Sequence, residues 1–313
     1  MPLHLDYRPD TLEDFVGSEN TIKALKAKIK SSDPPHVFLF TGPSGCGKTT
    51  LARIIARHFG AIGKDEEPED SLDYRELDSS QDRGIKTMRE IRQSSNYPPM
   101  SKPCKAILLD EVHQVTFDAQ EALLKPLEEV PKHVFFFLAT TDPQKLKTTL
   151  KRRCMHFELD PLTDEEMVDF LKGIVSSEEK RVPAKIIEKV ADESLGSPGM
   201  ALGILDKIID LPPKEMRKVI ERVAAEQNAA IDLCRSIFKK DKWANITSII
   251  RGLKNTKEDP ERVRRAVLGY CATILLKKES PSAYLVMDAF RNPFYDSPWE
   301  QLVLACYESR YAD

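Results

Sequence analysis

Short apolar runs alternate with amphipathic stretches over residues 33–159 of this 313-residue chain. Three of the runs are dense in β-favouring side chains and too short for ordinary helices, so we expect them to be buried strands. They lie at residues 36–40, 106–109 and 133–139. Alternation of buried strands with amphipathic helices is typical of a parallel sheet covered by helices, which predicts an α/β fold for this region.

One of the predicted helices contains a proline. Residues 116–129 have helical spacing, but Pro126 lies well inside the stretch. Proline lacks a backbone N–H, and its ring clashes with the preceding helical turn. We therefore expect Pro126 to kink this helix or to shorten it, so that it does not continue past Lys125.

The strand-like runs stop after residue 160, where Thr163 and Glu166 have the spacing of a capping box that opens a helix. The paired prolines at 212–213 mark a further boundary, and amphipathic stretches follow at 231–238 and 263–276. We predict an α/β domain and two helical domains, which span residues 1–160, 161–211 and 212–313. The aromatic residues of the last domain are expected in its core and at an interface: Trp243, Tyr270, Phe290 and Trp299.

Composition and charge narrow the class of protein. The formal net charge is -3, whereas a protein that coats nucleic acid unaided carries a strongly positive net charge. Any DNA binding by this chain must therefore use a local basic patch. No run approaches the roughly 18 to 20 apolar residues of a membrane span, and the first residues lack a secretion-signal pattern. The six cysteines are widely scattered, which predicts free thiols and no structural zinc. We expect a soluble intracellular protein without a membrane partner.

The strongest chemical signal is a P-loop directly after the first predicted strand. The motif G-x-x-x-x-G-K-[ST] is complete, and a helix is expected to begin near Thr50. Its glycines let backbone N–H groups turn towards phosphate oxygens, Lys48 would neutralise the β and γ phosphates, and the Thr49 hydroxyl would bind Mg²⁺. The expected ATP ligands are Gly42, Pro43, Ser44, Gly45, Cys46, Gly47, Lys48, Thr49 and Thr50.

A second signal lies at the end of the second predicted strand, where two carboxylates follow Leu108-Leu109. This is the pattern of a Walker B segment that reaches the same edge of the sheet as the P-loop. Asp110 would hold the metal with Thr49, and Glu111 would orient and polarise the water that attacks the terminal phosphate.

Further segments resemble the ATPase subunits of sliding-clamp loaders, the family that includes the bacterial gamma/tau subunit and replication factor C. Tyr7-Arg8-Pro9 and Phe15-Val16-Gly17 are similar to a family segment that packs beside the adenine, with Tyr7, Arg8 and Val16 as the contacts. Residues 110–113 are similar to the family's DExx box. The resemblance implies the AAA+ fold: a P-loop domain with a parallel sheet, a small helical lid and an all-helical collar.

Two segments resemble elements that read the γ-phosphate. Residues 138–146 are similar to sensor 1, with Thr141 as the polar side chain that contacts the phosphate or holds the water. Residues 150–154 resemble the family's SRC motif, with Arg152 in place of the serine and Arg153 aligned with the arginine finger. The resemblance implies that Arg153 supplies positive charge to the active site of a neighbouring subunit.

The resemblance also implies partners and cofactors. These are ATP and Mg²⁺, a sliding clamp, primer-template DNA, and other loader subunits in a pentameric ring closed by the collar. Arg83 and Lys86 precede and enter a helix that faces the DNA in the family, so they are candidate phosphate contacts. One departure is Gly199, which stands where the family usually has its sensor 2 arginine.

The leading hypothesis is an ATP-hydrolysing subunit of a clamp loader in the cytoplasm, or in the nucleus if the source is eukaryotic. A nucleotide-binding scaffold subunit with little turnover is an alternative, motivated by Gly199. A DExH helicase is a further alternative, suggested by Asp110-Glu111-Val112-His113. A helicase requires a second strand-rich domain, whereas residues 163–313 have a helical pattern.

Overall fold

A computed structural model describes residues 2–79, 82–213, 215–220, 229–255, 258–277, 279–294 and 297–311. The chain forms two compact units, Met1–Arg217 and Lys218–Asp313. The second unit therefore begins near the boundary expected at residue 212, while the boundary expected at residue 161 lies within the first unit.

The first unit is built on a five-stranded sheet in the order β2-β3-β4-β1-β5, and every pair of neighbouring strands is parallel. The strands are β1 (Val37–Thr41), β2 (Tyr74–Asp78), β3 (Lys105–Asp110), β4 (Val134–Thr140) and β5 (Met155–Glu158). The three predicted strands are confirmed as β1, β3 and β4. The hydrophobic pattern did not indicate β2 and β5, because they are edge strands with exposed positions in place of a continuous apolar run.

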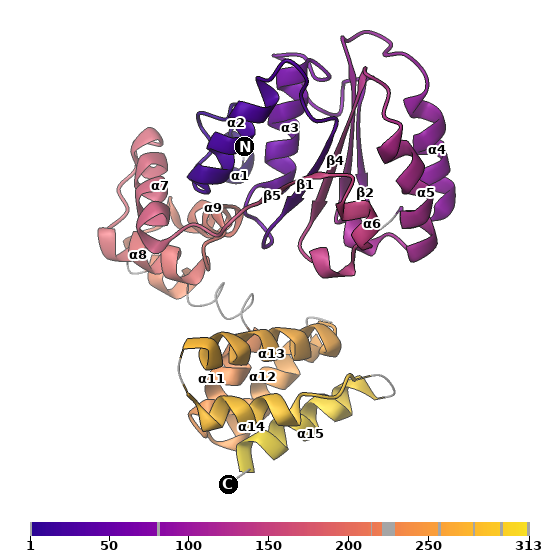
Figure 1. Cartoon of the computed structure of the whole chain (residues 1–313). Coiled ribbons are helices and arrows are strands. Elements are labelled where there is room, and N and C mark those ends of the chain that lie inside the picture. The colour runs from indigo at the N-terminus through magenta and orange to yellow at the C-terminus, as the bar shows by residue number, and fades with distance from the viewer. Residues whose placement is uncertain are drawn as a thin grey trace. The chain divides into compact units, whose positions relative to one another are not determined.

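Helices cover both faces of the sheet (Figure 1). Alternate residues of a strand point to opposite faces, so Phe38 and Phe40 of β1 belong to one core while Val37 and Leu39 belong to the other. On the first face lie α2 (Glu19–Ile29) and α3 (Lys48–Phe59). On the second face lie α4 (Ile85–Ser95), α5 (Phe117–Glu128) and α6 (Thr148–Lys151). Burial on both faces explains why the central strands read as unbroken apolar runs.

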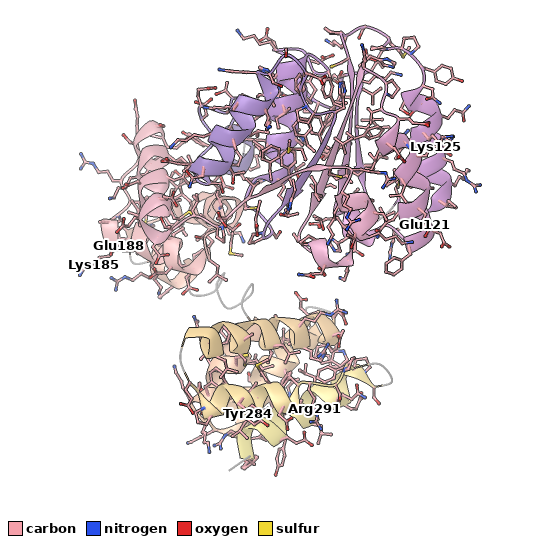
Figure 2. The ribbon with its side chains drawn as sticks, viewed as in Figure 1. Glu121, Lys125, Lys185, Glu188, Tyr284 and Arg291 are labelled. Atoms are coloured by element: carbon pink, nitrogen blue, oxygen red, sulfur yellow. The ribbon has the colours of Figure 1, made fainter. Side chains whose placement is uncertain are left out.

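The proline-containing helix α5 runs further than expected. Thr116 caps its start by accepting a hydrogen bond from the Ala119 N–H, and the helix continues through Pro126 to Glu128. The expectation that Pro126 shortens the helix is therefore wrong. Pro126 is buried and lies in the last turn, where a missing N–H removes a single helical hydrogen bond. Figure 2 shows Glu121 and Lys125 on the side of α5 that faces away from the sheet.

The rest of the first unit consists of helices beside the sheet. They are α1 (Leu3–Asp6), η1 (Val112–Gln114), η2 (Pro143–Lys145), α7 (Asp164–Ser177), α8 (Ala184–Glu193) and α9 (Pro198–Ile208). The predicted capping box is confirmed, because the Thr163 and Glu166 side chains exchange hydrogen bonds with each other's backbone N–H. Two hydrogen bonds join the N-terminal residues to these later helices: Leu3 N–H to Asp206 (3.1 Å) and Tyr7 OH to Glu178 (2.7 Å).

The second unit packs helices around a core of its own, as expected. They are α11 (Ala229–Phe238), α12 (Trp243–Asn255), α13 (Pro260–Lys277), α14 (Pro281–Ala289) and α15 (Pro298–Tyr311). Phe290 is fully buried, and Trp243, Tyr270 and Trp299 pack against the core as partly exposed side chains. All six cysteines of the chain are free thiols. Within the part of the chain that the structure describes, no helix is both long and apolar enough to cross a membrane.

Candidate nucleotide-binding site

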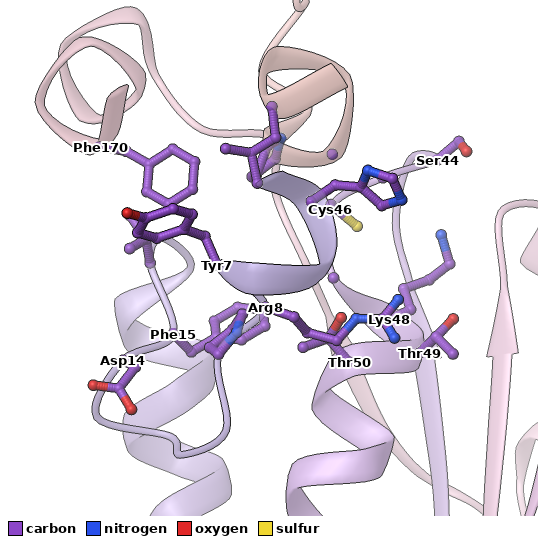
Figure 3. Close-up of a pocket in the computed structure, with 18 of the residues that line it drawn as sticks. Tyr7, Arg8, Asp14, Phe15, Ser44, Cys46, Lys48, Thr49, Thr50 and Phe170 are labelled. Carbon is purple, nitrogen blue, oxygen red and sulfur yellow. The ribbon is translucent and has the colours of Figure 1, made fainter. Parts of the chain in front are cut away.

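A cavity of about 320 Å³ lies where β1 and β3 end and α3 begins (Figure 3). Residues from the N-terminal segment, the P-loop, the end of β3 and the helices α7 and α9 line it. Most of the residues that we expected to contact ATP line it: Tyr7, Arg8, Val16, Ser44, Gly45, Cys46, Gly47, Lys48, Thr49, Thr50, Asp110 and Glu111. The sequence motifs therefore converge on one pocket.

The P-loop backbone requires its glycines. Gly42, Gly45 and Gly47 have φ angles of +145°, +76° and +96°, a region that other residues rarely adopt. A Cβ at Gly42 would lie 2.3 Å from the Leu159 carbonyl oxygen, and one at Gly45 would lie 2.1 Å from Ser197 Oγ. This turn can direct successive N–H groups at a phosphate, as the motif predicted.

Gly42 and Pro43, which are also predicted ATP ligands, are not among the residues that line the cavity. Their carbonyl oxygens instead accept hydrogen bonds from Lys48 Nζ at 2.9 and 2.8 Å. The lysine is buried and needs these partners because an unpaired buried charge is costly. These two residues thus hold the side chain of the lysine that we expect to bind phosphate.

Thr49 and Asp110 form a pair at the floor of the cavity. Thr49 Oγ1 donates a hydrogen bond of 2.7 Å to Asp110 Oδ2, and the Glu111 N–H donates to Asp110 Oδ1 at 2.8 Å. Burial raises the pKa of Asp110 above its usual value, although the hydrogen bond from Thr49 opposes the shift. A hydroxyl and a carboxylate are oxygen ligands of the kind that Mg²⁺ prefers, so the pair fits the expected metal site.

Glu111 follows β3 in a left-handed conformation, with φ of +47°. Its carboxylate accepts a hydrogen bond of 3.1 Å from Thr141 Oγ1, the side chain that we expected to sense the γ-phosphate. Thr141 follows the end of β4, which pairs with β3. Parallel strands thus bring the two predicted catalytic groups together, although Thr141 itself does not line the cavity.

The opposite end of the cavity is largely apolar and receives Tyr7, Phe15 and Phe170 (Figure 3). The hydrogen bond from Tyr7 to Glu178 raises the pKa of the tyrosine hydroxyl, which keeps it a donor. Burial lowers the pKa of Arg8, and the neighbouring charge of Arg53 adds to the effect. An aromatic surface of this kind suits the faces of a purine base.

Some lining residues were not among the predicted ligands: His4, Pro9, Asp14, Phe15, Phe170, Pro198, Gly199 and Leu202. Pro9, Phe15 and Gly199 belong to segments singled out by resemblance, and Pro198 and Leu202 lie in the same sensor 2 segment as Gly199. Phe170 on α7 lies in a helical apolar stripe, which from spacing alone indicates only a helix core. No local motif marks it as a pocket residue.

Gly199 packs against the P-loop, with its N–H 3.5 Å from the Gly45 carbonyl oxygen. A Cβ on Gly199 would lie 3.8 Å from Gly45, an ordinary van der Waals distance, so the site has room for a side chain there. Gly199, which stands where the family usually has its sensor 2 arginine, thus borders the cavity but brings no charge to it.

Three other predicted residues lie outside the cavity. Arg153 donates to Glu128 at 2.9 Å and to the Thr149 carbonyl at 2.8 Å. Arg83 and Lys86 are exposed at the start of α4. Ser80 and Gln81, from the segment that leads into this helix, lie outside the described residues.

Comparison with known proteins gives consistent results. The family model described as DNA polymerase III, delta subunit matches residues 17–163. DNA polymerase III subunit tau of Bacillus subtilis (strain 168) is 29% identical over 306 residues, which cover 91% of this chain and 54% of that protein. Subunit gamma of Buchnera aphidicola subsp. Acyrthosiphon pisum is 33% identical over 218 residues, 66% of this chain and 60% of that protein. The chain therefore spans little more than half the length of these relatives.

The Thermotoga maritima RuvB Holliday junction branch migration motor has a similar fold, with a TM-score of 0.57 and 21% identity over 74% of this chain and 79% of that chain. At this identity the likeness supports the AAA+ fold alone. The family match and the DNA polymerase III relatives agree with the motifs that line the cavity. The chain is therefore similar to the clamp-loader AAA+ proteins, the family that includes the gamma and tau subunits of bacterial DNA polymerase III.

Proposed function

We propose that this chain is an ATPase subunit of a sliding-clamp loader, which uses ATP binding and hydrolysis to open the clamp and place it on primer-template DNA. The observation that carries the proposal is the convergence of Lys48, Thr49, Asp110 and Glu111 on one cavity. These groups come from two motifs and meet in a chain that is similar to the clamp-loader family.

Each group has a role that its surroundings support. Lys48 neutralises the β and γ phosphates, while Glu111 polarises the attacking water as the terminal phosphoryl group leaves. Thr49 and Asp110 hold Mg²⁺, which screens the phosphate charge when bound. Thr141 contacts the γ-phosphate, since its hydroxyl lies beside the Glu111 carboxylate.

Arg153 acts in a neighbouring subunit's site in this proposal. It does not line the cavity of its own chain, and its side chain remains partly exposed beside Glu128. An arginine that enters from the adjacent subunit adds positive charge where the transition state is most negative.

The proposed partners follow from the same family assignment. Exposed Arg83 and Lys86 contact DNA phosphates, residues 161–211 form a lid over the nucleotide, and residues 212–313 form the collar of a pentameric ring. The sliding clamp and other loader subunits complete the assembly. Because bacterial replication takes place in the cytoplasm, we assign the chain to that compartment.

Gly199 motivates a second candidate function, a nucleotide-binding scaffold subunit with little turnover. Neighbouring P-loop residues are the same in either case, so ATP binding is expected of both. A helicase finds less support, because the described residues from 163 onwards form helices and contain no strand of a second sheet.

Single-turnover hydrolysis of ATP by the purified chain, with and without clamp and primed DNA, tests the proposal. An ATPase subunit gives turnover that clamp and DNA stimulate, and the Lys48→Ala protein loses it. If the chain binds ATP without turnover, and Gly199→Arg restores turnover, the result would instead identify the scaffold function. Turnover that survives in a folded Lys48→Ala protein would contradict both.

A further inference from the structure

His113 contacts the proposed catalytic carboxylate from a direction that the proposed reaction does not use. Its Nδ1 lies 3.1 Å from Glu111 Oε2 and 3.1 Å from Thr140 Oγ1. The histidine side chain is 9% exposed, whereas that of Glu111 is 34% exposed and borders the cavity. His113 therefore supports Glu111 from the protein side and Glu111 faces the nucleotide side.

The neighbouring glutamine defines which nitrogen of the ring carries the proton. The Gln114 side-chain nitrogen lies 2.9 Å from His113 Nε2, and an amide nitrogen can only donate. With Nε2 as the acceptor, Nδ1 carries the ring proton and is hydrogen-bonded to Thr140 Oγ1, while the Glu111 carboxylate lies in contact with the same nitrogen at 3.1 Å.

The backbone explains why Glu111 depends on such support. Its left-handed φ of +47° turns the residue off the end of β3, and this conformation is unfavourable for a side chain other than glycine. Among the described residues, Thr141 Oγ1 donates to Oε2 at 3.1 Å, the Thr141 N–H lies farther away at 3.4 Å, and His113 Nδ1 contacts the same oxygen at 3.1 Å.

Thr141 cannot serve Glu111 and the nucleotide at once. A hydroxyl has one proton to donate, and both the Glu111 carboxylate and a γ-phosphate oxygen accept it. When ATP is bound and Thr141 donates to the γ-phosphate, Glu111 loses this donor. His113 is the side chain that still holds the carboxylate.

We infer that His113 is a positioning residue that keeps Glu111 oriented towards the attacking water while Thr141 transfers its hydrogen bond from Glu111 to the γ-phosphate. The inference rests on the proposed ATPase function and adds a residue to it. His113 does not line the cavity, so its loss should lower kcat and leave ATP affinity unchanged.

The test compares His113→Leu, His113→Asn and wild type in steady-state hydrolysis with clamp and primed DNA, together with titration by a fluorescent ATP analogue. His113→Leu removes the ring nitrogen that contacts the Glu111 carboxylate, and we expect kcat to fall about tenfold to a hundredfold, the size of effect that misplacing a catalytic group produces. KM and analogue affinity should stay within about twofold. His113→Asn should restore most of the rate, because the asparagine amide nitrogen takes nearly the position of Nδ1.

His133→Leu is the matched control, since His133 is also partly buried but lies before the start of β4, at the end opposite to Thr140, where its ring contacts the Tyr97 carbonyl. It should leave kcat unchanged. In the Glu111→Gln background, His113→Leu should lower the residual single-turnover rate no further, because both changes act through one group.

The possible failures are distinguishable. Wild-type protein without turnover overturns the proposed function, and the positioning role falls with it. Normal kcat in a folded His113→Leu protein overturns the positioning role alone. A His113→Leu protein with weakened ATP affinity, or a His113→Asn protein as slow as His113→Leu, also overturns it, since the defect would then be a general one in the site.

Discussion

Thr49 Oγ1 donates a 2.7 Å hydrogen bond to Asp110 Oδ2, across 61 positions of the sequence. The contact exists because β1 and β3 both pair with β4, which brings the carboxyl ends of all three strands to one edge of the sheet. The P-loop starts its helix at that edge, so the hydroxyl of the first motif meets the carboxylate of the second. Their position relative to Lys48 and Glu111 is the basis for the predictions below.

Gly45→Ala should disable ATP binding without unfolding the chain. The new Cβ would meet Ser197 Oγ at 2.1 Å, and the φ of +76° costs an alanine about 1 kcal/mol more than glycine. We expect ATP affinity to fall by about tenfold or more, which corresponds to about 1.4 kcal/mol. Gly84→Ala is the control, because a Cβ there meets nothing within 4 Å. Equal affinities in the two folded variants, measured with a fluorescent ATP analogue, would argue against phosphate binding by this loop.

Glu111→Gln should separate binding from hydrolysis. The amide keeps the shape of the side chain but loses the charge that polarises water, so we expect normal ATP affinity with turnover reduced about 10²- to 10⁴-fold. Single-turnover measurements with labelled ATP provide the check. A wild-type rate would assign the water-activating role to another residue.

Arg153→Ala tests the proposed action between subunits. The site of the mutated chain keeps all its cavity residues, so its own ATP affinity should be about normal. In a reconstituted ring, hydrolysis should fall by about three orders of magnitude or more in the site that Arg153 faces. Arg153→Lys should rescue poorly, because an ammonium lacks the planar fork of donors.

The adjacent Arg152 is exposed and gives a matched control for charge. Arg152→Ala should leave hydrolysis in the neighbouring site intact. If Arg153→Ala weakens only DNA binding, with a smaller salt dependence and normal DNA-independent hydrolysis, Arg153 is a phosphate contact and the finger assignment is wrong.

Acid should weaken the second unit through Glu261. Hydrogen bonds from Arg264, with further support from the Phe294 N–H, lower the pKa of Glu261 from 4.5 to about 2. A lowered pKa means that the stabilisation is complete above pH 4.5 and is lost as the pH falls towards 2. Glu261→Gln should therefore reduce the free energy of unfolding at pH 7 by about 2 to 3 kcal/mol, a difference that disappears near pH 2.

Both tryptophans of the chain, Trp243 and Trp299, lie in the second unit, so urea unfolding followed by tryptophan fluorescence reports on it selectively. Glu300→Gln is a suitable control. Both residues are acids in the first turn of a helix, Glu300 in α15 and Glu261 in α13, but Glu300 is exposed. A Glu261→Gln deficit that is the same at pH 7 and pH 2 would show that the lost contact is not electrostatic.

Most of the predicted site residues were identified from local sequence motifs. The P-loop is contiguous, and its backbone angles are ones that its own glycines permit, so the sequence predicted the P-loop residues 44–49 that line the cavity. The central strands were equally readable, because burial on both faces leaves an unbroken apolar run. Pro126 shows the limit of such rules: one lost hydrogen bond in a last turn is offset by packing, which no local pattern records.

The contacts between distant segments required the tertiary structure. Edge strands β2 and β5 have weak hydrophobic patterns, because hydrogen bonds to one neighbouring strand hold them in the sheet although several of their positions are exposed. Phe170 and Leu202 reach the cavity only because α7 and α9 pack beside the P-loop, and His113 reaches Glu111 only through the turn after β3. Sequence determined which groups are candidates to bind and hydrolyse ATP, since that depends on residue type and local backbone. The fold decided which of them meet, because distances between remote residues are set by strand order and packing.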